Sequence, residues 1–257
     1  MKKLMPLAVV AALGGIVAAC NNTGDGSTKL QLSTYQYDTL VYDRQADSIT
    51  IPGAQYWKMQ GRGVLPVKIG GVSVPTLRDS LMSLANIQFN AGDAVPVVDS
   101  VNRILPYRNL PDSLRDLPTS YLSNRLSVYL ITPTVAVWEN YNENYVVGAA
   151  HGMYSTTYVN YSITDNKILS LNDFFKPGYE KELLKLIKEK LAERQDVSTD
   201  DSLSVPRNFC VTTDGLTLVY GLYEVAPYSS GEIRVDFASY ELSDLLSPAG
   251  EALLDAQ

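Results

Sequence analysis

The chain holds few of the side chains that perform catalysis or bind transition metals. It has one histidine, His151, and two cysteines, Cys20 and Cys210. A structural zinc site of the cysteine–histidine type needs four such ligands, so these counts argue against one. A serine–histidine–aspartate triad could use only His151, which lies in a loop-like stretch at 148–153. We therefore predict no metal and no cofactor, and we treat His151 as a binding candidate rather than a catalytic base.

The first twenty residues indicate export and a lipid anchor. Lys2 and Lys3 give a positive start, an uncharged apolar run follows at 4–17, and small residues lead into Cys20. This pattern is typical of a secretory signal peptide, and the run is shorter than the ~20 residues of a membrane-spanning helix. The sequence Val-Ala-Ala-Cys resembles a lipobox, in which the cysteine is acylated after cleavage. We expect lipidation of Cys20, and the alternative is an ordinary signal peptide that ends in cysteine.

The residues that follow bear on location. The polar segment 21–29 is expected to be a flexible tether. Asn21 is not an aspartate and gives no signal for retention at an inner membrane, so we expect an outer-membrane lipoprotein of the cell envelope, held by acyl chains such as palmitate. Lipidation would leave Cys210 without a disulfide partner, and its strand-like surroundings predict a buried structural thiol.

The charge balance bears on partners. Of 21 Lys and Arg residues, Lys2 and Lys3 lie in the predicted signal peptide, which leaves 19 basic against 28 acidic residues and a net charge of −9. Such a chain lacks the positive surface that contact with phosphates requires, and this argues against nucleic-acid binding. A negative chain instead attracts a cationic protein.

Period-two alternation predicts strands along most of the chain. Turns are expected at Gly70-Gly71, at Asn140–Asn144 and at Thr213-Asp214-Gly215. The strands near the C-terminus follow one another without intervening helices, which favours antiparallel pairing. The predicted strands are 30–51, 63–69, 126–131, 134–138, 145–147, 158–163, 209–212, 216–223 and 233–237.

Amphipathic spacing predicts two helices. Leu77, Leu81 and Leu84 share one face of a helix at 75–84, and the clearest helix spans 178–194. Short helical turns are expected at 112–117, and a final short helix from Ser239 to Leu246 that ends before Pro248. The fold class is therefore α+β, with antiparallel sheets and a few packed helices.

Turn-forming and aromatic residues are dense at 220–232. A predicted strand runs into Pro227, and a Ser-Ser-Gly turn follows Tyr228. A tyrosine beside a proline-bounded turn is a rigid anchor of the kind found in protein interfaces. The alternative is a connection whose tyrosines pack at the rim of the core. The binding candidates are His151, Tyr223, Pro227, Tyr228 and Ser229.

Three segments resemble, in order, the domain of unknown function at the C-terminal end of the RsiV-type anti-sigma factors. They are Gly-Ala-Ala-His-Gly at 148–152, Leu-Asn-Asp-Phe-Phe at 171–175 and Tyr-Glu-Val-Ala-Pro-Tyr-Ser-Ser-Gly at 223–231. The family patterns are Gly-Gly-Ala-His-Gly, Leu-x-Asp-Phe-Phe and Tyr-Glu-Ile-Ala-Pro-Tyr-Ala-x-Gly, so the departures replace small residues by small ones. The resemblance covers about 145–247.

The upstream part resembles the domain that precedes this one in RsiV and in the peptidoglycan deacetylase PdaC. The resemblance implies an RsiV ectodomain-like fold. The domains are then a signal peptide (1–20), a tether (21–29), a PdaC/RsiV-like α+β domain (30–155) and an RsiV-type C-terminal α+β domain (156–257).

The module of RsiV binds lysozyme. The resemblance therefore implies a lipid-anchored cell-envelope binding module for lysozyme-like hydrolases or peptidoglycan. The alternative is an envelope hydrolase or other enzyme that uses His151 with carboxylates such as Asp173, Glu224 and Asp236. No two of these groups pair by their spacing in the sequence, and general acid–base catalysis needs such a pair.

Overall fold

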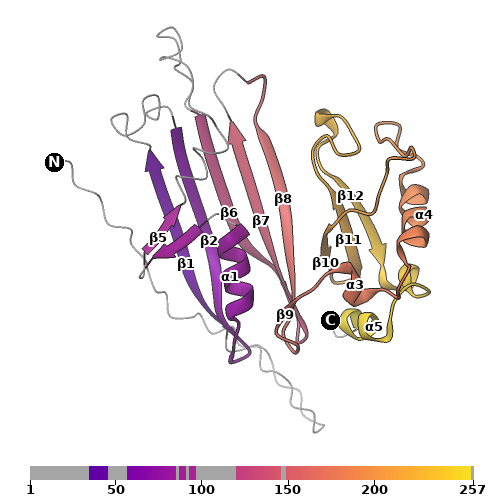
Figure 1. Cartoon of the computed structure of the whole chain (residues 1–257), viewed down its shortest axis with the longest axis horizontal. Helices are drawn as coiled ribbons and strands as arrows, with labels where there is room; N and C mark the ends of the chain where they lie inside the picture. Colours follow the sequence, from indigo (N-terminus) through magenta and orange to yellow (C-terminus); the bar gives the residue numbers. More distant parts are fainter. Residues whose placement is uncertain are drawn as a thin grey trace, which may run out of the picture. The chain divides into compact units, whose positions relative to one another are not determined.

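The computed structural model describes residues 35–45, 57–84, 87–90, 93–96, 120–145 and 149–255 (Figure 1). The predicted signal peptide, Cys20, the tether and the helical turns at 112–117 lie outside these residues. The chain forms two compact units, which are described separately. Unit 1 takes the described residues of Ser33–Ser127 and Asn140–Tyr154, and unit 2 those of Val128–Glu139 and Ser155–Gln257.

Antiparallel pairing dominates the sheets, so the predicted α+β class is confirmed. The largest sheet has the strand order β1-β2-β6-β7-β8-β9, with β3 also paired to β2. The pairing of β2 with β6 is parallel. These strands are β1 Gln36–Gln45, β2 Trp57–Ile69, β3 Val72–Ser73, β6 Ser120–Ile131, β7 Val135–Tyr145, β8 Met153–Ser162 and β9 Lys167–Ile168.

Unit 1 packs a helix against its sheet. Helix α1 (Pro75–Leu84) lies over β2, and Leu77 and Leu81 are fully buried together with Leu65 of β2. The turn before it uses Gly70 and Gly71 at φ of 58° and 81°, where glycine is favoured. A short hairpin of β4 (Ile87–Asn90) and β5 (Asp93–Pro96) follows α1.

Unit 2 is built around three antiparallel strands in the order β10-β11-β12. The central strand β11 is buried along its whole length, and Leu183 and Ile187 of α4 are fully buried in the same core. The elements after β9 are α3 Leu171–Phe174, α4 Glu180–Leu191, β10 Asn208–Val211, β11 Gly215–Tyr220, η3 Tyr228–Ser230, β12 Ile233–Ala238, η4 Ser239–Leu242 and α5 Pro248–Asp255.

Two asparagines join β8 to β10 within unit 2. Asn160 of β8 and Asn208 of β10 each donate one hydrogen bond to the other strand and accept one from it. Their side-chain amides therefore satisfy backbone groups that direct hydrogen bonds between two paired strands would otherwise satisfy. The four bonds are Asn160 Nδ2 to Phe209 O (2.7 Å), Val211 N to Asn160 Oδ1 (2.9 Å), Asn208 Nδ2 to Thr156 O (2.6 Å) and Tyr158 N to Asn208 Oδ1 (3.0 Å).

Three predicted elements were wrong. The strand that was expected to run into Pro227 ends at Tyr220, and turns follow it. The turn expected at Asn140–Asn144 is part of β7. Asn124 of β6 donates to the side-chain oxygens of Asn140 and Asn142 at 2.6 Å, so hydrogen bonds to the neighbouring strand accommodate residues that favour turns elsewhere.

The last helix was also misplaced. The chain makes only a short 3₁₀ turn at Ser239–Leu242, and α5 begins at Pro248 instead of ending before it. Ser247 accepts a bond from Gly250 N at 3.0 Å, so a serine cap followed by a proline in the first turn starts this helix. Among the described residues, no helix is both long and apolar enough to cross a bilayer.

Candidate functional site

Residues 221–231 form a structured loop between β11 and β12. Gly221 N donates to Glu224 Oε2 at 2.8 Å, and Glu224 N donates back to Gly221 O at 3.2 Å, which closes the first turn. Tyr223 adopts a φ of 64°, a left-handed conformation that is uncommon for a tyrosine. Its side chain is 55% exposed. The turn therefore presents an aromatic ring to solvent.

The second half of this loop brings the predicted tyrosines together. The rings of Tyr223 and Tyr228 lie 5.7 Å apart between centroids. Pro227 and Ser229 are exposed, and Tyr228 is half-buried. A 3₁₀ turn fixes them, because Ser230 N donates to Pro227 O at 3.0 Å. The structure thus gathers four of the predicted binding residues on one loop.

A second loop, residues 195–204, supports the first and is called the acidic loop. Ser198 N donates to Val225 O at 2.7 Å, which ties the two loops together. Hydrogen bonds from Arg194 and from the Ser230 hydroxyl lower the pKa of Asp196 to about 2. Hydrogen bonds from Ser202 are the main cause of the lowered pKa of Asp200. Both carboxylates are therefore charged at neutral pH.

The two loops carry a negative surface beside the tyrosine pair. The two loops contain four exposed carboxylates and no Lys or Arg residue. Two cations lie nearby: Arg194 forms an ion pair with Asp196 at 2.6 Å, and Lys188 of α4 interacts electrostatically with Asp200. These exposed carboxylates are Asp196, Asp200, Asp201 and Glu224. An aromatic centre with an acidic border suits a partner of positive charge.

His151 occupies a different place in the chain. It lies in unit 1, in the bend that precedes β8, and its side chain is exposed. Its Nδ1 lies 2.9 Å from the carbonyl oxygen of Gly152. The binding candidates thus divide between the two units, with His151 in unit 1 and the 221–231 loop in unit 2.

The carboxylates of the enzyme alternative have local partners. Partial burial raises the pKa of Asp173, but bonds from Lys167 and from Ser170 outweigh it, so the pKa is lowered. Asp173 caps α3 by accepting from Ser170 N at 2.7 Å. Asp236 accepts from the Thr217 hydroxyl at 2.5 Å. Among the described residues, no three His, Cys, Asp or Glu side chains gather as metal ligands would.

Sequence reasoning missed a polar cluster around Arg234. Its guanidinium donates to the Tyr158 hydroxyl at 2.9 Å and lies 5.4 Å from the centre of that ring. The Tyr158 hydroxyl in turn donates to Glu139 at 3.1 Å. The only sequence signal is the alternation of Arg234 and Asp236 along β12, which gives no hint of Glu139.

Cys210 lies beside this cluster. It is fully buried and free, so the predicted structural thiol is confirmed. Its Sγ is 3.9 Å from an Arg234 nitrogen. Burial nevertheless raises the pKa of the thiol to about 11, so Cys210 is protonated and a poor nucleophile at neutral pH.

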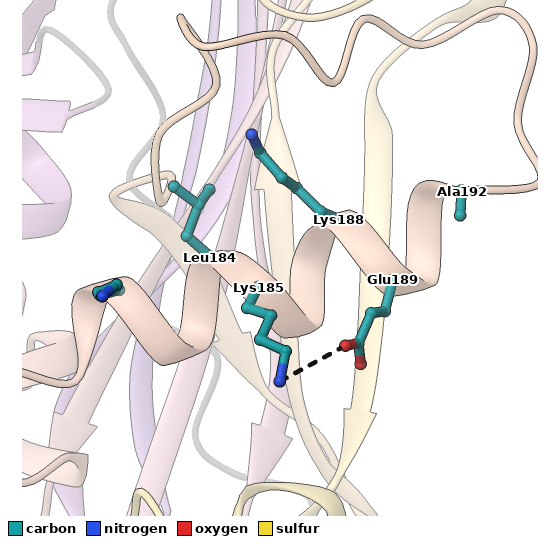
Figure 2. Close-up of a pocket in the computed structure, with 6 residues that line it drawn as sticks. Leu184, Lys185, Lys188, Glu189 and Ala192 are labelled. Carbon is teal, nitrogen blue, oxygen red and sulfur yellow. Dashed lines mark ion pairs between the residues drawn. The ribbon is translucent and has the colours of Figure 1, made fainter.

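A shallow hollow of about 430 Å³ lies on the outer face of α4 (Figure 2). Figure 2 shows Lys185 and Glu189 turned toward each other, as a pair 4.0 Å apart, and Lys188 turned away. The described residues that line the hollow belong to α4, apart from Ala192 directly after it, and three of them are lysines. Among the described residues, no group lines the hollow from an opposite side, so these residues do not form a site that encloses a ligand.

Residues 172–238 match the family described as "Protein of unknown function (DUF3298)". The chain is also 28% identical over 130 residues to the peptidoglycan-N-acetylmuramic acid deacetylase PdaC of Bacillus subtilis. The aligned region covers 46% of this chain and 27% of that protein. The chain thus spans about a quarter of the length of this curated relative. The matched family region contains the 221–231 loop and Arg234 and leaves out His151.

Two solved structures share the fold. One is a DUF3298 family member from Bacteroides fragilis, with a TM-score of 0.61 and 18% identity over 85% of this chain and 96% of that one. The other is a DUF3298 family protein from Pseudomonas aeruginosa, with a TM-score of 0.59 and 16% identity over 85% and 97%. These two structures show a shared fold, while the match to the family model is confined to residues 172–238 and the similarity to PdaC is of low identity.

Proposed function

We propose that this chain is a cell-envelope binding module that docks a cationic protein, such as a lysozyme-like hydrolase, on the 221–231 loop. The observation that carries the proposal is the pairing of the exposed Tyr223 with Tyr228 on a turn that is hydrogen-bonded to the acidic loop. The relation to PdaC supports an envelope setting.

The physical argument rests on rigidity and charge. A tyrosine held by a 3₁₀ turn loses little conformational freedom on binding and contributes a large contact area. The carboxylates of the acidic loop would speed the approach of a cation and would be weakened by salt. A docking surface of this kind needs no reactive group.

Binding is favoured over catalysis because the carboxylates available to an enzyme already serve local structure. Asp173 caps α3, Asp236 accepts from Thr217, and Glu224 closes the turn at Gly221. We therefore propose no catalytic residue in this chain.

The experiment is a calorimetric titration of the full chain in detergent with lysozyme. We expect saturable binding that weakens as salt rises, and a loss of at least about tenfold in affinity for Tyr228→Ala. Tyr240→Ala is the matched control, since Tyr240 is 78% exposed and lies outside the loop. The same titration with cytochrome c, another cationic protein, shows whether charge alone is enough for binding. A titration with soluble peptidoglycan fragments tests the alternative partner.

The lysozyme proposal fails if no heat is measured at tens of micromolar and low salt. It also fails if cytochrome c binds equally well, or if Tyr228→Ala binds as the unchanged chain does. Binding of peptidoglycan fragments in place of lysozyme would likewise replace the protein partner by a glycan.

We further propose that Cys20 carries the membrane anchor and that the chain faces the periplasm or the outside from the outer membrane. The polar tether would let the two units reach partners near that membrane.

A further inference from the structure

A carboxylate in the acidic loop joins the end of α4 to the 221–231 loop. Asp196 accepts two hydrogen bonds from the Arg194 guanidinium, from Nε at 3.1 Å and from Nη2 at 2.6 Å. It also accepts a bond from the hydroxyl of Ser230, the last residue of the 3₁₀ turn η3. We call Arg194, Asp196 and Ser230 the Asp196 link.

Two further hydrogen bonds attach the same loops to each other. Ser198 N donates to Val225 O at 2.7 Å, and Val225 is buried in the core of unit 2. The Tyr220 hydroxyl donates to Ser204 O at 2.8 Å. Both bonds lie at the first half of the 221–231 loop. The Asp196 link extends the attachment to the second half, which carries Tyr228.

The turn that carries Tyr228 depends on such an attachment because its own hydrogen bonds are few. It is three residues long, and Ser230 N donates to Pro227 O and Gly231 N to Tyr228 O, both at 3.0 Å. Short 3₁₀ segments gain little stability from their own hydrogen bonds. A turn that moved would also separate the Tyr228 ring from that of Tyr223, which lies 5.7 Å away.

The Asp196 link provides position rather than charge. The guanidinium and the carboxylate form a bidentate ion pair, so their charges largely cancel for a partner that approaches from a distance. Asp201 of the acidic loop is exposed and takes no part in the link. The acidic loop therefore contains one carboxylate that holds the turn and another whose charge acts on an approaching partner.

We propose that Asp196 is a positioning residue, which acts through Ser230 to hold the Tyr228 turn in the arrangement that docks the partner. This inference rests on the proposed function of the 221–231 loop and assigns to that site a residue outside the loop. A turn that is already ordered loses less conformational freedom on binding, so breaking the link should shorten the lifetime of the complex. The rate of encounter depends instead on charge.

The main test is Ser230→Ala, which breaks the link without changing the charge of the chain. Binding kinetics of the full chain in detergent with lysozyme should show dissociation about three- to tenfold faster, and association within about twofold of the unchanged chain. Ser230→Thr keeps the hydroxyl and should restore slow dissociation. Asp201→Asn should have the opposite effect, with slower association, weaker salt dependence and unchanged dissociation. Asp244→Asn, at an exposed carboxylate outside both loops, is the control and should change neither rate.

A double-mutant cycle tests whether Asp196 acts through Ser230. Asp196→Ala should speed dissociation in the unchanged chain and much less in the Ser230→Ala background, because the link is already broken there. Hydrogen–deuterium exchange gives a readout without any partner. Exchange of the Gly231 amide should be at least about fivefold faster in Ser230→Ala and in Asp196→Ala, and unaltered in Asp201→Asn.

The inference is overturned if Ser230→Ala dissociates from lysozyme as slowly as the unchanged chain. It is also overturned if the effects of Ser230→Ala and Asp196→Ala are additive, or if neither changes exchange at Gly231. In each of these cases the unchanged chain still binds lysozyme, so the proposed function stands. A chain that does not bind lysozyme at all overturns the proposed function, and the docking role of Asp196 falls with it even where exchange at Gly231 responds as expected.

Discussion

Arg234 shows how a single side chain organises unit 2. It reaches the hydroxyl and the ring of Tyr158, and through that hydroxyl it is linked to Glu139. A charged residue that makes several such contacts is costly to remove, because its partners are left with unmet bonds. The three groups come from β12, β8 and β7.

Arg234→Met should therefore destabilise the chain. Methionine keeps much of the aliphatic stem but leaves the Tyr158 hydroxyl without its donor, and we expect a loss of about 1–3 kcal/mol in the free energy of unfolding. Denaturant unfolding measures it. Arg207→Met, at an exposed position, is the control, and equal stability of the two variants would contradict a structural role for Arg234.

Cys210 offers a prediction about pH. The thiol has a pKa of about 11 in the folded chain, mainly through burial, against an ordinary value of 9.0. The unfolded chain loses this proton first, so the contribution of Cys210 to stability is complete below about pH 9 and falls as the pH rises towards 11. Comparing unfolding of the parent chain and Cys210→Ala from pH 8 to 11 should show a steeper decline for the parent. Parallel curves would argue against the raised pKa.

Asn160 and Asn208 link β8 to β10 through four side-chain hydrogen bonds, which we call the asparagine bridge. Asn160→Ala removes one donor and one acceptor and leaves Phe209 O and Val211 N unpaired in a buried region. We expect a cost of about 2–4 kcal/mol, measured by chemical denaturation. The exposed Asn172→Ala should cost far less, and a similar cost for both variants would show that the bridge contributes little.

Gly250 in α5 packs against Phe174 so closely that a Cβ at this position would lie 2.0 Å from the Phe174 carbonyl oxygen. Gly250→Ala should therefore destabilise α5 and its contact with α3 by about 2 kcal/mol or more, despite the better helix propensity of alanine. Thermal unfolding tests it. Ala249→Gly, at the exposed neighbour, should cost only about 1 kcal/mol, and a stabilised Gly250→Ala would refute the close packing.

The elements also show what the sequence reveals and what it conceals. The spacing of Leu183, Ile187 and Leu191 predicts α4, because a helix with one apolar face is recognised from its own residues. Asn140 and Asn142 could not be assigned to a strand from their types, since their hydrogen bonds depend on Asn124 of another strand. Pro248 carried the correct signal for a helix start and was interpreted as a stop.

In the candidate site, too, features formed within one segment could be predicted, and features that depend on contacts between segments could not. The 221–231 loop was predicted because its turn residues and tyrosines are contiguous in the chain. The contact between the acidic loop and the 221–231 loop and the polar cluster around Arg234 each combine residues from distant segments, such as Ser198 with Val225. No periodicity within one segment reports such pairs.

The proposed anchor at Cys20 determines where in the cell envelope the two units act. Cys20→Ser should move the chain from the membrane fraction to the soluble fraction and abolish incorporation of labelled palmitate, because acyl chains supply most of the membrane affinity. Cys210→Ser is the matched control and should remain labelled. Label that persists in Cys20→Ser would place the anchor elsewhere.

The interleaving of the two units governs how the chain can be cut. Val135 and Val137 belong to the core of unit 2 and are fully buried there, although they precede the last residues of unit 1. A fragment that starts at residue 156 lacks both and would expose the apolar surface that they cover. The first half of β7 belongs to unit 2 and its second half, from Asn140, to unit 1, so each unit needs part of the same strand. Expression of either half by itself should yield an insoluble product.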